Sequence, residues 1–426
     1  MPEDYLPGLV PLLKAAVERS PTMIASSINV ASSQAGVLAG ISPMLPQLSG
    51  SAQYLWSKES TLHGPSSAPT SGLYYSLGVT QNLFEWGALK NAAVIARLNR
   101  DIAERQYSDA YRMLAISIRE QYMILITKHI VLRNARFALK LANENLQVAQ
   151  ARFDAGNSSE AEIGNVKLAV EQAQLDADAA QEDFSYADRM LTRLAGVDVL
   201  AEEQVPIELP HPAFAPEMAD AIVTGFVGGG DESTFQSQIY KMEIDADRRN
   251  YKIAKVRLLP KVSFGAGASY SNQSEPVGNT INQVGVQAES YNVAANWAIF
   301  DGFATRAAKE QALDAIATAK HQMQTFVDQS VDQVYDMRKE LELSYRAMKL
   351  AEVHNGLIEA EVKRIGDDKG LGYASQATVD AGIMNQNATQ LNQALARNNF
   401  YSRWTEFVST TGVDPVISML SPRYGR

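Results

Sequence analysis

Few side chains in this sequence have the type and spacing that metal binding or acid–base catalysis requires. The chain has no cysteine, which excludes disulfides, thiol catalysis and cysteine-based metal sites, and it has five histidines. Metal-binding histidines commonly recur at short intervals, as in H-E-x-x-H, whereas these are scattered. The sequence therefore predicts neither a metal site nor a catalytic histidine. The five are His63, His129, His211, His321 and His354.

Other catalytic arrangements are equally absent from the sequence. No nucleophile with a neighbouring base, carboxylate pair or cofactor loop emerges at a usable spacing. The glycines at 228–230 are not followed by G-K-[ST], so they predict a flexible turn rather than a phosphate-binding loop. Single carboxylates such as Glu144 and Asp176 fall on outer faces of helical heptads, where solvated charge is the ordinary interpretation. We expect neither an enzyme nor a bound cofactor.

The chain repeats itself. "LFEWGALKNAA" and "IFDGFATRAA" place Phe84 and Phe300 216 positions apart (300 − 84), and Gly156 and Gly372 have the same offset. Pro46 aligns with Pro260 at an offset of 214, which indicates a small insertion or deletion between the copies. A fixed offset of this kind indicates two copies of one unit. We assign repeat 1 to residues 1–210 and repeat 2 to 211–426, with a mixed, equatorial connector at 197–234.

Composition narrows the class of protein. Forty-eight acidic against 38 basic residues give a net charge of −10, which disfavours nucleic acid as a partner. The longest uncharged stretch, 20–57, contains polar residues, glycines and three prolines, so we expect no transmembrane helix. No basic, then apolar leader follows Met1. Either the chain is cytosolic or a leader was removed.

Long helices dominate each copy. Residues 88–154 contain neither proline nor glycine, which predicts a helix of roughly 100 Å. Its apolar residues recur every seventh position, so we expect it to pair with a return helix at 159–195 in an antiparallel coiled-coil hairpin. Repeat 2 predicts the same at 304–365 and 375–411. Because each return helix is about half as long, helices at 9–45 and 235–259 are expected to stack on its end. The first stripe is Tyr111, Ile118, Leu125, Leu132, Leu139, Leu146 and Phe153.

Between these helices the period changes to two. Residues 47–56 and 73–83, and their counterparts 262–271 and 289–299, alternate apolar with small polar side chains over about ten residues, a pattern typical of membrane-spanning β-strands. A half-buried soluble hairpin has the same alternation, so both interpretations stay open here. The polar stretches between paired strands, 57–71 and 272–285, predict loops.

Four strands cannot close a barrel. In lipid the open edges would leave backbone groups unpaired, so a membrane-embedded sheet requires further copies of the chain. Two copies would give eight strands and a barrel filled by its own side chains, and a lumen needs more. The small residues expected to face inward suggest a wide polar interior. They are Ser49, Ser51, Ser76, Gly78, Gly265 and Gly267.

The repeated phrase falls where the second strand of each copy meets the long helix. We expect Gly87 and Gly302 to permit a backbone bend there. The acids beside them would lie at a helix N-terminus, where negative charge is favourable by ~0.3–1 kcal/mol. The strand-to-helix bend comprises Phe84, Glu85, Gly87, Phe300, Asp301 and Gly302. We assign it no chemistry.

The doubled order of "LPQLSGSAQY", "LFEWG", a long helix, "RFDAGNSSEAEI" and "LAGVD" resembles the outer-membrane efflux protein family, the TolC-like exit ducts of Gram-negative bacteria. The resemblance implies an α+β membrane protein with a pseudo-two-fold repeat, each copy a β-hairpin plus a long helical hairpin. It further implies a homotrimer in outer-membrane lipid, with a 12-stranded β-barrel and a 12-helix α-barrel that extends into the periplasm.

The resemblance also implies functional residues. The family's R-x-x-x-G-x-x-S hairpin tip, which looks like an adaptor-docking site, matches Arg152, Gly156 and Ser159. In the second copy Gly372 and Ser375 match, but Asp368 replaces the arginine, with Arg364 one turn earlier. Asp380 is the candidate for an aspartate ring that narrows the periplasmic mouth.

The implied function is the outer-membrane channel of a tripartite efflux pump or type I secretion system. Its partners would be a periplasmic adaptor (membrane fusion protein) and an inner-membrane pump. A soluble or peripheral coiled-coil scaffold is the alternative, but it leaves the four alternating strands without explanation.

Overall fold

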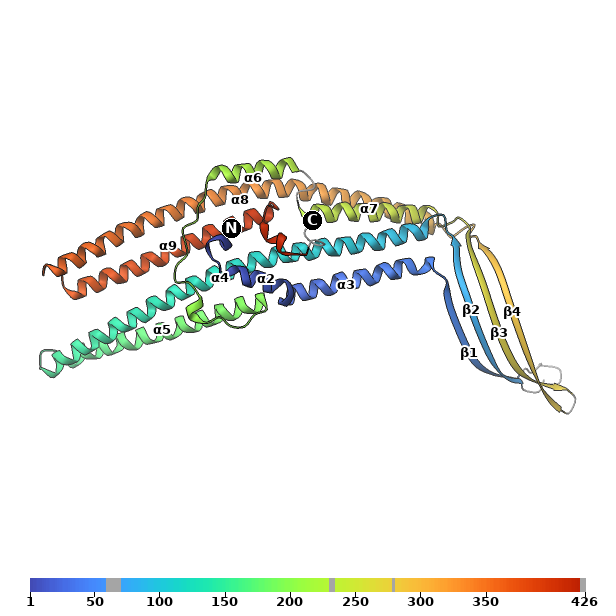
Figure 1. Cartoon of the computed structure of the whole chain (residues 1–426), viewed down its shortest axis with the longest axis horizontal. Helices are drawn as coiled ribbons and strands as arrows, with labels where there is room; N and C mark the ends of the chain where they lie inside the picture. Colours follow the sequence, from blue (N-terminus) through green and yellow to red (C-terminus); the bar gives the residue numbers. More distant parts are fainter. Residues whose placement is uncertain (59–69, 230–233, 278–279, 422–426) are drawn as a thin grey trace. The chain divides into compact units, whose positions relative to one another are not determined.

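The computed structural model describes residues 1–58, 70–229, 234–277 and 280–421 of the chain. The described part is mostly helical, with a four-stranded antiparallel sheet (Figure 1). The chain forms two compact units. The helical unit takes residues 1–29, 104–238 and 324–426, and the sheet unit takes residues 30–103 and 239–323.

The elements follow the order of the two repeats. The helices are α1 (Pro2–Tyr5), α2 (Leu9–Arg19), α3 (Pro21–Ile41), α4 (Ala88–Asp154), α5 (Glu160–Ala195), α6 (Pro216–Gly229), α7 (Phe235–Lys255), α8 (Ala304–Gly370) and α9 (Gln376–Thr410). The strands are β1 (Gln47–Ser57), β2 (Thr70–Phe84), β3 (Lys261–Val277) and β4 (Thr280–Asn296). Short 3₁₀ turns are η1 (Ser42–Met44), η2 (Glu202–Gln204) and η4 (Pro415–Met419).

The heptad stripes form the core of the helical unit. Tyr111, Ile118 and Leu125 of α4 are fully buried, as are Val334 and Leu341 of α8. In α5 the matching stripe is also buried. Burial of side chains at seven-residue spacing is the geometry of paired helices, which the sequence predicted. The buried residues of α5 include Ile163, Ala177, Phe184 and Leu191.

Contacts between helices fix their order across the helical unit. Lys128 of α4 pairs with Asp183 of α5 at 2.6 Å. On its other side α4 meets α9, where the Asn134 amide donates to the carbonyl of Asn387 at 3.1 Å. Arg403 of α9 in turn pairs with Glu340 of α8 at 3.0 Å. The order is therefore α5–α4–α9–α8, with α5 and α8 at the two flanks (Figure 1).

The single helix expected at 9–45 is two helices, so that expectation was wrong. Ser20 is extended (ψ 133°) and Pro21 begins α3. Proline has no N–H for the helix ladder and disfavours helical backbone in the residue before it, which explains the break. In repeat 1 the expected meeting of helix ends does occur, between α2 and α5. A Cβ on Gly196, just past α5, would lie 2.3 Å from the carbonyl oxygen of Arg19 at the end of α2.

The connector at 197–234 contains a helix that the sequence analysis missed. α6 buries Ala219, Val223 and Phe226 on one face, against the core formed by α8 and α9. Their spacing of four and three residues is helical. Gly228 and Gly229 belong to α6 rather than to the expected turn, and Gly230 lies outside the described residues.

Several element ends differ from those expected. α8 continues to Gly370 through Gly366, because interior glycine costs only ~1 kcal/mol, and the left-handed residue that reverses the chain is Gly372. α7 ends at Lys255, before 259. β4 ends at Asn296 rather than 299, since its partner β3 begins there, at Lys261. β3 and β4 also extend to 277 and from 280, so most of the polar stretch expected as a loop is paired backbone. The first expected loop lies mostly outside the described residues.

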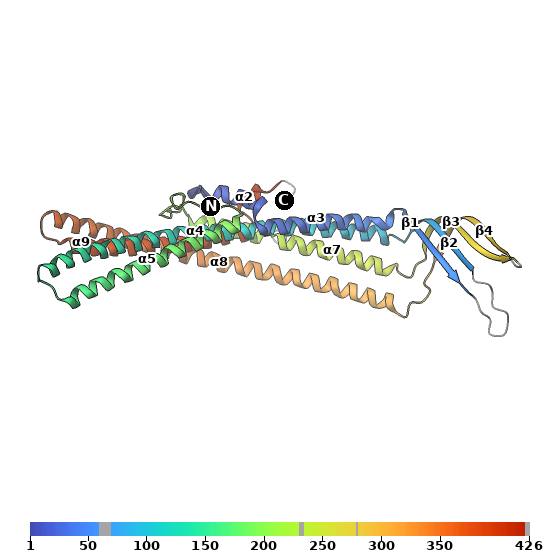
Figure 2. The ribbon, with the colours of Figure 1, turned by 90° about the horizontal axis from the view of Figure 1, so that it is seen from below.

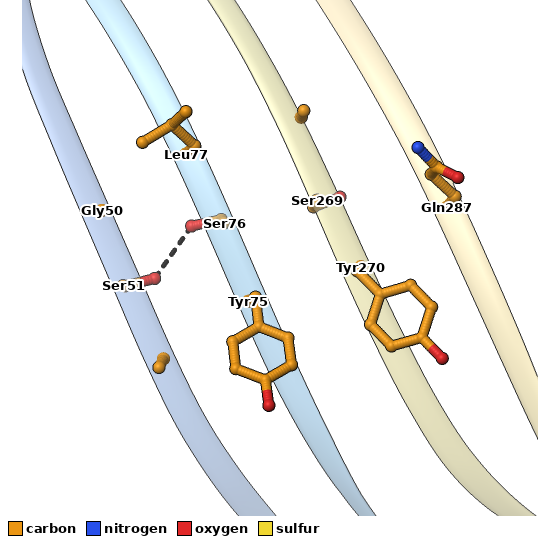
Figure 3. A pocket seen from close by; sticks show the side chains of 10 residues that line it. Gly50, Ser51, Tyr75, Ser76, Leu77, Ser269, Tyr270 and Gln287 are labelled. Carbon is orange, nitrogen blue, oxygen red and sulfur yellow. Dashed lines mark hydrogen bonds between the residues drawn. The ribbon is translucent and has the colours of Figure 1, made fainter.

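The sheet has one apolar and one small polar face. Leu48 pairs with Val79, Val79 with Ala266, and Ala266 with Tyr291, so apolar side chains form rows across it. On the other face Ser51 and Ser76 share a hydrogen bond of 2.8 Å (Figure 3). The apolar side chains of β1, β2 and β4 are largely exposed, which is unusual for a sheet in water. They include Leu48, Tyr54, Trp56, Leu77, Tyr291 and Val293.

One helical stretch has the length and composition of a membrane span, although the sequence analysis expected none. Residues 9–44 contain a helix that is long and apolar enough, by length and composition alone, to cross a bilayer, and only 6% of that window is buried. From Ser20 onward this stretch carries no charge, and serine and glycine lower its hydropathy less than charged residues would.

Candidate functional site

The two hairpin tips have the same backbone structure, 216 residues apart. In the first tip Gly156 is left-handed (φ 72°), and the N–H of Asn157 donates to the carbonyl of Arg152 at 2.8 Å. In the second Gly372 is left-handed (φ 79°), and the N–H of Tyr373 donates to Asp368 at 2.8 Å. Both helices end at a left-handed glycine, and the N–H groups at the turn hydrogen-bond to carbonyls of the last helical turn.

The serines of both tips begin the return helices. The Ser159 hydroxyl accepts from the N–H of Glu162 at 3.2 Å, and the Ser375 hydroxyl accepts from the N–H of Thr378 at 3.1 Å. Such N-caps contribute about 1 kcal/mol to a helix. In the helical unit both tips lie at the same end (Figure 1). The structure therefore brings the two candidate docking turns to one end of the helical unit.

The side chains of the two tips differ. Arg152 is exposed, and within the described residues no ion pair or hydrogen bond engages its guanidinium. At the matching position Asp368 accepts from Arg364 at 2.8 Å, so the acid that replaces the arginine is already neutralised. The second tip also exposes Leu371 and Tyr373.

Asp380 lies one turn into α9. Its carboxylate is half-buried and accepts a hydrogen bond of 2.7 Å from Gln376. Within one chain nothing distinguishes it as a constriction, because a ring of carboxylates would need several copies.

The strand-to-helix corners use a backbone that the sequence did not reveal. Trp86 (φ 55°) and Gly87 (φ 82°) are both left-handed, as are Gly302 (φ 63°) and Phe303 (φ 70°). Two successive left-handed residues turn the chain out of the sheet and into the helix. Each copy therefore places one aromatic residue where glycine would be expected, at a cost of ~1 kcal/mol or more. Trp86 is held by its indole N–H, which donates to the carbonyl of Pro260 at 2.8 Å.

The aromatic residues of each corner contact one another. Phe84 packs edge-on against Trp86 with ring centroids 5.0 Å apart, and Phe300 packs against Phe303 at 5.4 Å. All four are largely exposed. Exposed aromatic residues at the end of an apolar sheet are typical of a membrane–water interface.

The two acids of the corners have different partners. Asp301 accepts from both the N–H (2.9 Å) and the hydroxyl (2.6 Å) of Thr305, in the first turn of α8. Glu85 instead pairs with Lys261 at 3.2 Å. The equivalent acids therefore stabilise the corners in two ways, one as a helix cap and one as an ion pair with β3.

A buried ion cluster in the helical unit was not foreseen from the sequence. Arg119, in the middle of α4, is fully buried and donates to both oxygens of Asp414, at 2.5 and 2.9 Å. Its Nε also donates to Glu3 of α1 at 3.0 Å. Burial alone would raise the pKa of Asp414, but the hydrogen bonds from Arg119 and Ser409 and the positive charge lower it. The cluster joins both ends of the described chain to the longest buried stripe, which no local sequence signal could show.

Two histidines form contacts between the connector and the long helices. His129 Nδ1 lies 3.0 Å from the carbonyl oxygen of Val205. His211 Nδ1 lies 2.7 Å from Glu352 Oε1, which also accepts from Arg397 at 3.0 Å. Burial would raise the pKa of Glu352, yet these partners lower it. These histidines therefore have structural roles. In the described ranges no group of histidine, aspartate and glutamate could hold a metal ion.

Comparisons with known proteins agree with this geometry. Residues 12–197 match the family model for outer membrane efflux protein. The pyoverdine export outer membrane protein OpmQ of Pseudomonas putida is 25% identical over 278 residues, which cover 62% of this chain and 57% of that protein. The chain therefore matches little more than half of the length of this relative.

Solved outer-membrane proteins share the fold. The outer membrane protein VceC of Vibrio cholerae has 17% identity and a TM-score of 0.67, with 96% of this chain and 97% of that chain covered. The CmeC outer membrane channel of Campylobacter jejuni has 12% identity and a TM-score of 0.72, with 96% and 87% covered. At such identities the likeness shows the fold alone.

The sheet and the paired hairpins give the chain the fold of these outer-membrane proteins. Over residues 12–197 the chain resembles the outer membrane efflux protein family, and its location is the outer membrane of a Gram-negative bacterium. This is a family of channels and not of enzymes.

Proposed function

We propose that this chain, as a homotrimer, is the exit duct of a tripartite efflux pump or a type I secretion system. It would conduct substrates passively from a periplasmic adaptor and an inner-membrane pump to the exterior, without catalysis of its own. The observation that carries the proposal is the sheet, which combines an exposed apolar face with two edge strands, β1 and β4, that pair with nothing within the described chain.

The dimensions of the sheet fit a bilayer. Along β1 the apolar face runs from Leu48 to Trp56, a span of eight residues (56 − 48). At ~3.3 Å per residue and a tilt of ~40°, this is a band of ~20 Å, comparable with the ~25 Å of outer-membrane barrels. Because open edges are too costly in lipid, β4 of one copy must pair with β1 of the next. Three copies of a four-stranded sheet would give twelve strands.

The helical unit also exposes two apolar stripes, which we propose form the interface, or seam, between neighbouring copies. Besides its buried stripe, α8 carries Leu343, Leu350 and Leu357, which are exposed and seven residues apart. α5, at the opposite flank, exposes Leu168 and Leu175 with the same spacing. Two different surfaces that meet head to tail generate a closed ring when the rotation fits. We therefore assign the α8 stripe of one copy to the α5 stripe of the next, which would give twelve helices around a tunnel.

Reconstitution tests the proposal. The purified protein is expected to require detergent, to have the mass of three chains by light scattering, and to form discrete ion-conducting pores in planar bilayers. A water-soluble monomer that forms no pores would contradict it.

The tips are the proposed adaptor contacts, and Gly156 is the residue to change. Gly156→Glu should reduce efflux at least tenfold in cells that supply the adaptor and pump, because it places a charge and a strained left-handed residue in the docking turn. A Cβ at this position would meet no atom within 4 Å, so the trimer should still form. Gly225→Glu, at an equally open position in α6, is the matched control. Full efflux by Gly156→Glu would reject the docking role.

A further inference from the structure

The sheet unit carries a basic patch where its helices approach the sheet. The patch consists of Lys90 on α4 and Arg248, Lys252 and Lys255 on α7. All four side chains are exposed, and within the described part of the chain no ion pair or hydrogen bond engages them. In a chain with a net charge of −10, four unpaired cations in one place need an explanation.

The four side chains lie on helix faces that point away from one cavity, and Arg249, next to Arg248, donates to Asn91, next to Lys90, at 3.4 Å. A cavity of about 270 Å³ between α4, α7 and α8 is lined by Ala88, Ile253 and Ala254 among others. At 100° per residue, Lys90 lies about 200° around α4 from Ala88. On α7 the three cations, spaced four and three residues apart, lie on the face opposite Ile253 and Ala254. The patch therefore faces away from the cavity.

The position of Lys261 on β3 relates the cavity, and so the patch, to the two faces of the sheet. Lys261 lines the same cavity, and on β3 it alternates with Val262 and Phe264, so it belongs to the small polar face. The cavity therefore lies on the polar side of the sheet, and we assign the patch, which faces away from it, to the apolar side. Figures 1 and 2 show α7 running up to the strands within this unit.

The patch is close to the ends of the strands. Lys90 is six residues after Phe84, the last of β2, and Lys255 is six residues before Lys261, the first of β3. Along α7, Arg248 and Lys255 are only about 10 Å apart at 1.5 Å per residue. This is comparable with the ~8 Å Debye length at physiological salt, so the patch would act on a charged surface at the sheet's helical end.

The helix of repeat 1 that corresponds to α7, α3, lacks these cations. At the offset of 214 the three α7 cations correspond to Gln34, Leu38 and Ile41, and α3 has no charged residue at all. Helix formation at this place therefore does not require basic side chains, and the cations must serve something else.

We propose that this basic patch binds the headgroups of anionic phospholipids in the leaflet that meets the helical end of the sheet. The inference rests on the proposed placement of the sheet in the membrane. Lysine and arginine clusters beside a membrane span attract anionic lipid, and their long side chains reach the headgroups while the exposed aromatic residues of the corners lie at the interface.

Lipid titration of the full-length protein in detergent tests the patch. Native mass spectrometry would compare phosphatidylglycerol with phosphatidylcholine of the same acyl chains. We expect at least tenfold tighter binding of phosphatidylglycerol, and loss of this preference in the triple variant Lys90→Gln, Lys252→Gln, Lys255→Gln. The matched control removes three exposed lysines of the helical unit, with Lys140→Gln, Lys167→Gln and Lys363→Gln, and should keep it.

Each result is decisive. An unchanged preference in the triple variant, or an equal loss in the control, would overturn the proposal. Glycerol 3-phosphate that competes as well as the lipid would identify a soluble-anion site instead, and would also overturn it. Failure of the proposed function is separately visible, because the triple variant should still form conducting trimers. A wild-type protein that conducts but shows no lipid preference refutes the patch alone.

Discussion

Arg119→Met is expected to lower the free energy of unfolding by about 3–5 kcal/mol, because it leaves the buried carboxylate of Asp414 without its counter-charge. Arg119 is fully buried and holds Asp414 by two hydrogen bonds, so water cannot replace it. Urea unfolding of the protein in detergent, followed by circular dichroism, measures the change. A loss below 1 kcal/mol would contradict the importance of the cluster.

An exposed arginine provides the control. Arg136 of α4 pairs with Glu202 at 2.5 Å, but half of its side chain is accessible. Surface ion pairs contribute ~0–1 kcal/mol, so Arg136→Met should have little effect. The triple variant Arg119→Met, Asp414→Asn, Glu3→Gln removes all three charges and should recover part of the loss, since it leaves no buried charge without a partner.

The same cluster makes stability depend on pH. In the folded protein the pKa of Asp414 is lowered, so the unfolded chain binds its proton more readily. The contribution is therefore fully present above the ordinary aspartate value and is lost as pH falls through the lower, folded value. We expect wild-type stability to fall in that acidic window, and the Arg119→Met variant to lose less there.

Leu350→Glu is expected to weaken assembly of the trimer at least 100-fold while each chain stays folded. Leu350 lies at the centre of the exposed stripe between Leu343 and Leu357, where the proposed seam would be least accessible to water. A 100-fold change corresponds to ~2.7 kcal/mol, within the range for a central interface residue, and burial of a charge adds to it. Light scattering over a dilution series measures the change, and circular dichroism reports the helix content.

A matched substitution separates the seam from general effects of charge. Val148 of α4 is also exposed, but α4 already has α5 and α9 of its own chain on its two sides. Val148→Glu should therefore leave the trimer intact. If Leu350→Glu also assembles normally, the α8 stripe is not a seam.

Periodicity was the most informative property of the sequence. Seven-residue spacing predicted the buried residues of α4, α5 and α8, and alternation predicted the four strands and their two faces. Periodicity did not predict where helices and strands end, because the ends depend on single residues and on the length of the neighbouring strand. Pro21 divides the first helix, Gly366 fails to end α8, and β4 stops where β3 offers no further partner.

The candidate site was only partly visible beforehand. The glycines and serines of the tips were found from the repeated motif, and their turn and cap geometry follows from local chemistry. The left-handed Trp86 and Phe303 were missed, since local preference disfavours this backbone and only packing holds it. The stripe from Leu343 to Leu357 was also missed. Its seven-residue spacing is visible in the sequence. However, α8 has two apolar stripes, and the sequence does not show which of them is buried by other helices of the same chain.

By itself the sequence determined the repeat, the helical and strand periods and the residues of the tips, because these follow from interactions between neighbours along the chain. Only the tertiary structure decided that α5 and α8 lie at the flanks and that Arg119 meets Asp414. These features join residues far apart in the chain, and long-range packing leaves no local signal from which they could be predicted.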